Sequence, residues 1–484
     1  MMNILQKYKN LSLPLKATIW FTICNFILKG ISFITVPLFA RYLSPEQYGI
    51  TSVYNSYQQI FLIFATLELS LGAFQRGIIR YKENLNLFIN SLQLLWSSIT
   101  VILFMIVLLF KDLFIKLTDT NLVILTLMFG YFLVYPAYDC WANQKRFNYD
   151  YRPVVIATIL FAIVTTCGSL FSVIFIKQTA IVRITSILII QILYCAPFYF
   201  KNINIKKLIH NLSKVKEFWL FSLNFQLPLI FHSLSYLVLA QSDRIMIGMM
   251  VGKSEAALYS VAYSLSNVVI IFQTSINQVL KPWRYQKMES KEYKLICSIT
   301  NLLLVIIGMV LLLFVLIAPE IMKLLFNVDY YEAIWTIPPV TLSVYFMFLY
   351  SVFTDIESYF CKTKYIMYAS IICAIINVVL NYFGIIYFGY ISCGYATLFS
   401  YILFAIMHYL YMVKSCKQEG IKKSIFNKKV IIVLSSVYIF LMIVCVMIYP
   451  YTSIRIIIFL LILLLFFIKR NVIISTIKLL KNKI

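Results

Sequence analysis

LICSITNLLLVIIGMVLLLFVLIA, residues 295–318, is a run without a single charged side chain. Lys291 and Lys294 precede it, and Glu320 and Lys323 follow it closely. A helix of about 20 apolar residues is long enough to cross the hydrocarbon core of a bilayer. The stretch therefore predicts a transmembrane helix. Similar apolar runs, each bounded by charged or turn-forming residues, can be sought in the rest of the chain.

The same pattern of an apolar run between charged or turn-forming residues recurs along the whole chain. We therefore expect an all-α polytopic membrane protein with about fourteen transmembrane helices. The predicted spans lie near residues 17–40, 50–75, 87–110, 121–143, 154–176, 180–200, 218–251, 257–280, 295–318, 331–360, 365–388, 391–413, 430–449 and 453–468.

The lysines and arginines fall mainly on alternate connections between these spans. Of the 42, 32 lie in the N-terminal segment, in the connections after even-numbered spans and in the C-terminal tail, whereas eight lie in the other connections. Two, Lys29 and Arg244, lie inside spans. Because an excess of Lys and Arg marks the cytoplasmic face, both termini are expected in the cytoplasm.

The composition excludes several classes of protein. With 62% hydrophobic and 12% charged residues, the chain is not a soluble globular protein. The net charge of +24 lies in the connections, so anionic membrane lipids are expected as partners rather than nucleic acid. Residues 248–254 are one residue short of a phosphate-binding loop, and no Cys/His cluster or nucleophile–base set occurs. We therefore expect no cofactor, metal or catalytic residue.

Two basic connections, at 201–217 and 414–429, divide the chain into three parts. These are an N-lobe of six helices at 1–209, a C-lobe of helices 7–12 at 210–415, and helices 13 and 14 with a tail at 416–484. Because each lobe holds an even number of spans, both begin at the cytoplasmic face. The two lobes are therefore expected to be parallel repeats.

The first two spans of each lobe carry polar side chains at helical spacing. Such side chains inside a bilayer usually face a bundle interior or a watery cavity. We expect these four stripes to line a substrate cavity; the alternative is hydrogen bonding between helices of a static bundle. The candidate residues are Asn25, Lys29, Ser32, Asn55, Gln59, Asn224, His232, Arg244, Asn267 and Gln278.

Lys29 is the most informative of these residues. Roughly 18 Å of helix separates it from either face, too far for its side chain to reach the surface. It needs an anionic ligand, a watery cavity, or a carboxylate partner such as Asp243. For the Arg244 side chain three roles stay open: it could reach the membrane surface, pair with Asp243, or contact the substrate. Asp243 and His232 are the candidates for ion coupling.

Other carboxylates have weaker assignments. Glu68 lies opposite the polar stripe of its span, which favours an interlobe or structural partner over the cavity. Asp139, Asp355 and Glu357 lie near inner span ends, where interfacial anchors are common.

Three stretches carry a resemblance to a known family: VPLFARYLSPEQYG at 36–49, SDRIMIG at 242–248, and residues 365–401 with IINVVLN at 375–381 and GYAT at 394–397. With them the chain resembles Wzx-type polysaccharide flippases, including those for O-antigen, of the multidrug/oligosaccharidyl-lipid/polysaccharide exporter superfamily. The resemblance implies two six-helix lobes around a central cavity.

The resemblance also implies a function and a location. Flippases of this type move undecaprenyl-diphosphate-linked oligosaccharide repeat units to the outer leaflet of the bacterial cytoplasmic membrane by alternating access. Their expected partners are the lipid-linked oligosaccharide, a polysaccharide polymerase and other assembly proteins.

Two other functions are weighed against this one. An ion-coupled drug/cation antiporter of the same fold is expected to concentrate acidic residues in its lobes, whereas the deepest charge here is a lysine. A membrane-embedded glycan polymerase or ligase typically carries a sizeable outer loop, whereas every non-cytoplasmic connection here is short. We therefore expect a transporter rather than an enzyme.

The distribution of basic residues makes the topology testable. Alkaline phosphatase fused after residue 209 or after residue 421 should be inactive, because both sites are expected to face the cytoplasm. A fusion after Lys253, in an expected outer turn, is the active control. Strong phosphatase activity at 209 or 421 would reverse the orientation.

Overall fold

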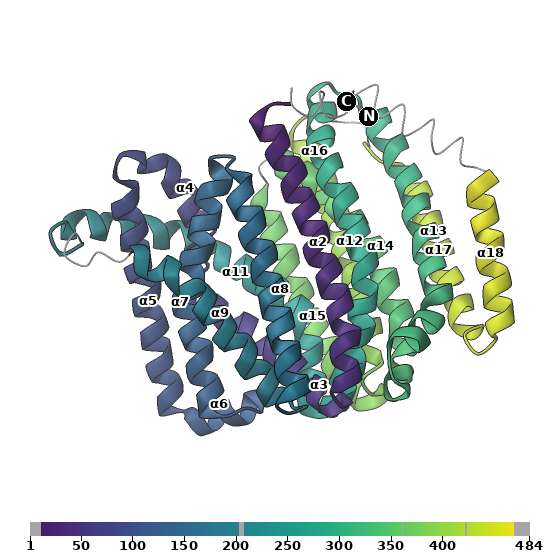
Figure 1. Cartoon of the computed structure of the whole chain (residues 1–484). Coiled ribbons are helices and arrows are strands. Elements are labelled where there is room, and N and C mark those ends of the chain that lie inside the picture. Colours follow the sequence, from purple (N-terminus) through teal and green to yellow (C-terminus); the bar gives the residue numbers. More distant parts are fainter. Residues whose placement is uncertain (1–10, 203–207, 361, 422–423, 469–484) are drawn as a thin grey trace, which may run out of the picture. The chain divides into compact units, whose positions relative to one another are not determined.

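The computed structural model describes the chain except residues 1–10, 203–207, 361, 422–423 and 469–484, and the side chains at 202, 228, 232, 363 and 465–468. Every element in this described part is helical (Figure 1). In chain order they are α2 (Leu13–Tyr42), α3 (Pro45–Thr66), α4 (Gly72–Arg80), η1 (Lys82–Asn84), α5 (Leu85–Leu109), α6 (Lys111–Thr118), α7 (Leu122–Phe147), α8 (Tyr151–Phe175), α9 (Ala180–Asn202), α11 (Leu212–Met250), α12 (Lys253–Glu289), α13 (Tyr293–Leu325), η2 (Val328–Thr336), α14 (Ile337–Tyr359), α15 (Thr363–Phe388), α16 (Ser392–Gln418), α17 (Lys428–Met447) and α18 (Thr452–Ile468).

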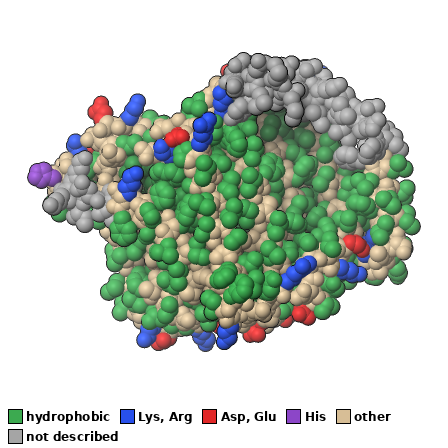
Figure 2. Space-filling model, viewed as in Figure 1, with side chains coloured by type: hydrophobic (Ala, Val, Ile, Leu, Met, Phe, Trp, Pro, Cys, Tyr) green, Lys and Arg blue, Asp and Glu red, His purple; other side chains and the backbone are tan. Residues whose placement is uncertain are grey.

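The all-helical membrane fold is confirmed. Each predicted span contains a helix, and 12 helices in the described part are long and apolar enough to cross a membrane. The two spans outside that set are α3, which is rich in polar side chains, and α18, which has 17 residues. On the face shown in Figure 2, hydrophobic side chains predominate, and the charged side chains lie mainly near its edges. This distribution suits helices whose walls face lipid.

The predicted span at 50–75 is wrong as one continuous helix. α3 ends at Thr66, and Leu67 and Glu68 both take the left-handed backbone conformation with φ of 48°. The chain then restarts as α4, whose Ala73, Phe74, Gly77 and Ile78 are buried. A break of this kind inside a membrane protein needs partners for the backbone groups it frees.

Side chains from neighbouring helices supply those partners. The Asn143 amide donates to the Ser70 carbonyl at 3.0 Å, and the Ser70 hydroxyl donates to Asp139 at 2.7 Å. The Ala73 N–H donates to the side chain of Gln226 at 3.0 Å. Asp139, which we interpreted as an interfacial anchor, therefore stabilises the break. Hydropathy did not show this break because its residues are mostly apolar.

The chain forms two compact units, Met1–Leu237 and Val238–Ile484, which divide within α11. In the first unit α7 packs against α9, and α2 packs against α8. Its cores gather around Phe88 and Trp96 on α5 and around Phe129 and Phe132 on α7. The division into 1–209, 210–415 and 416–484 stays a prediction.

In the second unit α14 packs against α12 and α16, and α15 packs against α16. The last two helices are fastened to α13. On α17, the Tyr438 ring covers Gly308, where any side chain would overlap it, and its hydroxyl donates to the Val305 carbonyl at 2.9 Å. On α18, Arg455 donates to both oxygens of Glu320 at 2.7 and 2.8 Å. Polar anchors thus hold helices whose sequences are otherwise almost entirely apolar.

Candidate functional site

A buried carboxylate, Asp243, lies where α11, α12, α15 and α16 of the second unit meet. Its side chain is 1% exposed. One oxygen accepts hydrogen bonds from the hydroxyls of Tyr259 and Thr397, the latter at 2.8 Å, and the other accepts from the Asn381 amide. These three donors come from three different helices, so the carboxylate is a centre of packing.

A second layer of polar groups surrounds this centre. The side-chain oxygen Oδ1 of Asn377 accepts from the Asn381 side-chain amide at 3.1 Å and from the Ser242 hydroxyl at 3.2 Å. The Asn377 amide in turn donates to Ser400 at 3.3 Å. All of these groups are buried. A buried polar network this large is costly unless nearly every member is satisfied.

Helical spacing explains how the sequence builds this cluster. Asn377 and Asn381 are four residues apart on α15, and Thr397 and Ser400 are three apart on α16, so each pair shares a face. Gly394 lets α16 begin close to α14, because a Cβ there would lie 3.0 Å from Pro339. Two of the three stretches that carry the family resemblance therefore meet at Asp243.

The cluster has the chemistry of a small-cation or proton site. An ionised carboxylate in a dry interior needs a positive charge or a proton. Within the described part of the chain, the buried side-chain oxygen Oδ1 of Asn381 has no hydrogen-bond partner. Carboxylate and amide oxygens are the ligands that hard cations prefer. Asp243, Asn377, Asn381 and Thr397 could together hold such an ion.

Arg244 does not supply the counter-charge by a direct ion pair. Its guanidinium donates to the Ala240 carbonyl at 2.9 Å and to the Gln241 side chain at 2.8 Å. It also lies 4.5 Å from the centre of the Tyr263 ring. Of the three alternatives for Arg244, the structure therefore disfavours pairing with Asp243.

The polar stripe of α2 lies in the first unit. Lys29 is half-buried, and Asn25 and Ser32 are exposed. The Ser32 hydroxyl donates to the Leu28 carbonyl at 3.0 Å, so its own helix satisfies it. Substrate contact by Lys29 and Asn25 stays a prediction. On α3, Asn55 is half-buried and Gln59 is exposed.

The other predicted cavity residues belong to α11 and α12. Asn224 is exposed on the part of α11 that belongs to the first unit. On α12, Asn267 is half-buried and Gln278 is exposed. The side chain of His232 is outside the described residues. The cavity role of all these residues stays a prediction.

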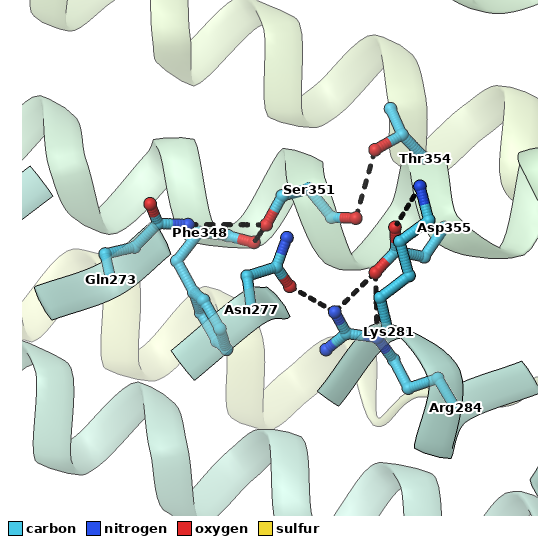
Figure 3. A network of polar contacts seen from close by, with 8 residues as sticks. All are labelled: Gln273, Asn277, Lys281, Arg284, Phe348, Ser351, Thr354 and Asp355. Atoms are coloured by element: carbon cyan, nitrogen blue, oxygen red, sulfur yellow. Dashed lines mark hydrogen bonds and ion pairs between the residues drawn. The ribbon is translucent and has the colours of Figure 1, made fainter. Parts of the chain in front are cut away.

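Sequence reasoning missed a second charged network, which joins α12 to α14 (Figure 3). Arg284, 1% exposed, donates through Nε to Asp355 at 3.0 Å and through Nη2 to both Asp355 and Asn277. Lys281 approaches the other Asp355 oxygen at 3.6 Å. Asp355 is therefore a buried partner of two cations, and its interpretation as an interfacial anchor was wrong.

Glu357, two residues further along α14, pairs with His408 of α16. Both side chains are fully buried, and His408 Nδ1 lies 3.1 Å from each carboxylate oxygen. This second anchor interpretation was also wrong. Two carboxylates within one apolar span were the signal available in the sequence. Their partners, 71 and 51 residues away, could not be found from spacing along the chain.

Residues 15–288, more than half of the chain, match the family model described as polysaccharide biosynthesis protein. The chain belongs to this family. A second model, MatE, matches residues 228–383, which contain Asp243, Arg284 and Asp355.

Two curated relatives come from Haemophilus influenzae. Protein 1 of the Lsg locus is 28% identical over 273 residues, which are 54% of this chain and 64% of that protein. An uncharacterized membrane protein is 26% identical over 366 residues, 72% of this chain and 84% of its own length. The match to the first thus spans less than two thirds of that protein.

Two solved structures show the same fold. The first is a lipid II flippase, MurJ, in an inward closed conformation. It matches with a TM-score of 0.68 and 18% identity, and the match covers 94% of this chain and 100% of the MurJ chain. The second is an inward-facing multidrug resistance MATE transporter, with a TM-score of 0.64 and 13% identity. That match covers 82% of this chain and 96% of the transporter chain. This family member is therefore a multi-pass membrane protein with a transporter fold.

The Arg284–Asp355 pair predicts an asymmetric response to mutation. Asp355→Asn leaves a buried guanidinium without its counter-charge and should cost about 3–5 kcal/mol of stability. Replacing both residues, as Arg284→Met with Asp355→Leu, should recover much of that loss because no buried charge remains. Thermal unfolding of the purified variants, followed by tryptophan fluorescence, measures both. Equal loss in the single and double variants would contradict the pairing.

Proposed function

We propose that this protein moves lipid-linked oligosaccharide repeat units from the cytoplasmic to the outer leaflet of the bacterial cytoplasmic membrane, for surface polysaccharide biosynthesis. The substrate we propose is an undecaprenyl-diphosphate-linked glycan, carried by alternating access of the two lobes. Both termini would face the cytoplasm. A polysaccharide polymerase and other assembly proteins are the proposed downstream partners.

The observation that carries this proposal is the family match over residues 15–288, which includes the polar stripes of α2 and α3. The flippase fold over 94% of the chain supports it, as does the relative from the Lsg locus. A flippase must shelter a sugar and a diphosphate while the lipid tail stays in the bilayer. The exposed Asn25 and Gln59 and the half-buried Lys29 offer hydrogen bonds and positive charge for that task.

The energy source we propose is an ion gradient acting through Asp243. Each charge moved across the membrane yields about 2.3 kcal/mol per 100 mV. An ion or proton bound by Asp243, Asn381 and Thr397 would cancel the carboxylate charge and so favour one packing of α11, α12, α15 and α16. Release of the ion or proton would favour a different packing of these helices. Binding can drive a change only through such a difference between states.

A second candidate function, ion-coupled antiport of drugs or cations, has one observation in its favour. The MatE model covers residues 228–383, where Asp243 lies in a cluster suited to an ion. The two functions share this coupling site and differ in the substrate that the lobes enclose. Surface polysaccharide synthesis, measured in a strain lacking the protein, separates them.

Lys29→Ala should abolish restoration of surface polysaccharide in a flippase-null strain, because the substrate's diphosphate would lose a cation. Lys29→Arg should retain part of the activity, since the charge stays while the geometry changes. Lys16→Ala, on the same helix but nearer its end, is the matched control and should remain active.

Membrane levels of each variant are measured in parallel by immunoblot. Full activity of a well-expressed Lys29→Ala protein would exclude substrate contact by Lys29. If neutralising a carboxylate together with Lys29 restores activity, the lysine is part of a structural pair instead.

Asp243→Asn should make transport insensitive to an imposed ion gradient in proteoliposomes, because a neutral amide cannot bind and release the coupling charge. His232→Ala tests the other candidate in the same assay. Thr397→Ser, which keeps the hydroxyl donor, is the control and should respond like the native protein. An unchanged gradient response in both Asp243→Asn and His232→Ala would remove these residues from the coupling role.

A further inference from the structure

A pocket of about 490 Å³ opens on the first unit between the end of α4 and the first half of α11. It is lined by Arg80, Tyr81, Glu217, Phe221, Asn224 and Phe225. Arg80 and Tyr81 immediately precede the candidate membrane span Lys82–Leu109, and Glu217 immediately precedes the seventh predicted span. Whichever way the chain is oriented, the pocket lies at the depth of lipid headgroups.

The pocket holds one positive and one negative side chain, each oriented by aromatic neighbours. The Arg80 guanidinium lies 4.9 Å from the centre of the Phe221 ring and 5.5 Å from that of Tyr81. The Glu217 carboxylate accepts a hydrogen bond from the Tyr81 hydroxyl at 3.1 Å. The two charges are therefore held by rings and a hydroxyl around them, and the pocket is close to neutral overall.

The walls of this pocket are fixed by packing. The Tyr81 ring meets Phe88, Phe218 and Phe221 at centroid distances of 5.2, 4.5 and 5.4 Å. Trp219, which follows Phe218 on α11, donates through its indole N–H to the Ser91 carbonyl of α5 at 2.9 Å. Burial, followed by the hydrogen bond to Glu217, raises the pKa of the Tyr81 hydroxyl, so it remains a donor. The site is preorganised rather than formed by loose side chains.

The charges and the rim together restrict the ligand. A guanidinium binds phosphate through two parallel hydrogen bonds. A carboxylate beside aromatic faces suits a primary ammonium group. Leu220 and Phe225 leave an apolar rim, with 53% and 38% of their surfaces exposed. A purely anionic headgroup would be repelled by the Glu217 carboxylate, and an uncharged sugar would leave both charges without a counter-charge.

We propose that this pocket binds the phosphoethanolamine headgroup of a bilayer phospholipid, with its phosphate on Arg80 and its ammonium on Glu217. The apolar rim at Leu220 and Phe225 then receives the start of the acyl chains. A lipid bound here would bridge α4 and α11. These two helices are also joined by the hydrogen bond from the Ala73 N–H to the Gln226 side chain. The inference does not depend on the transported substrate.

Native mass spectrometry of the full chain tests the site. The protein is reconstituted with equimolar phosphatidylethanolamine and phosphatidylglycerol, extracted in mild detergent, and examined for lipid that remains bound. The native protein should retain phosphatidylethanolamine preferentially. Arg80→Gln and Glu217→Gln should each lower that retention about tenfold or more, because each removes a charge-assisted contact to the headgroup.

Matched variants separate the site from general charge effects. Arg76→Gln, on the exposed side of α4 and outside the pocket, should retain the lipid as the native protein does. Arg80→Lys should give an intermediate value, because it keeps the charge but loses the paired hydrogen bonds. Glu217→Gln should also shift the preference toward phosphatidylglycerol, since the pocket becomes net positive. Size-exclusion profiles confirm that each variant is folded.

Three results would overturn the proposal. Equal retention of phosphatidylethanolamine by the native protein, Arg80→Gln and Glu217→Gln would show that the pocket does not bind it. Preference of the native protein for phosphatidylglycerol would assign an anionic lipid. Displacement of the bound lipid by a soluble oligosaccharide would assign the pocket to sugar.

Discussion

The structure depends on one constraint: inside a bilayer, polar and charged groups must find partners within the protein, because neither lipid nor water supplies them there. This constraint explains why the carboxylates buried in apolar spans have specific partners. Asp355 is paired with Arg284, Glu357 with His408, and Asp139 with Ser70. These pairs join segments that are far apart in the sequence, so they contribute to the choice of neighbours as well as to stability.

The Asp243 cluster meets the same constraint differently. Its hydrogen-bond donors, the hydroxyls of Tyr259 and Thr397 and the Asn381 amide, are uncharged. A carboxylate surrounded by neutral donors changes its charge state more readily than one that is locked to a guanidinium. In the account we propose, the ion pairs hold the second unit together, while this cluster responds to an ion or proton.

Hydropathy and the helical period predicted the class of fold and nearly all of the helices, because a bilayer imposes a fixed length on each span. They could not predict the break after Thr66. The break depends on Asn143 and Gln226, which come from distant helices and show no local signal. For the same reason the partners of Asp355 and Glu357 were missed. Asp243 was indicated by the polar face of its span, whereas Asn377, Asn381 and Thr397 lie in stretches that were singled out only for family resemblance.

The central claim, that the chain carries lipid-linked glycans across a bilayer, is tested most directly with the purified protein in proteoliposomes. A lipid-linked oligosaccharide is incorporated with the protein, and a glycosidase that cannot cross the membrane is added outside. The account predicts that the protected half of the glycan becomes accessible to the enzyme much faster than in protein-free vesicles. A protected half that stays inaccessible, while the same vesicles exchange organic cations for protons, would contradict it.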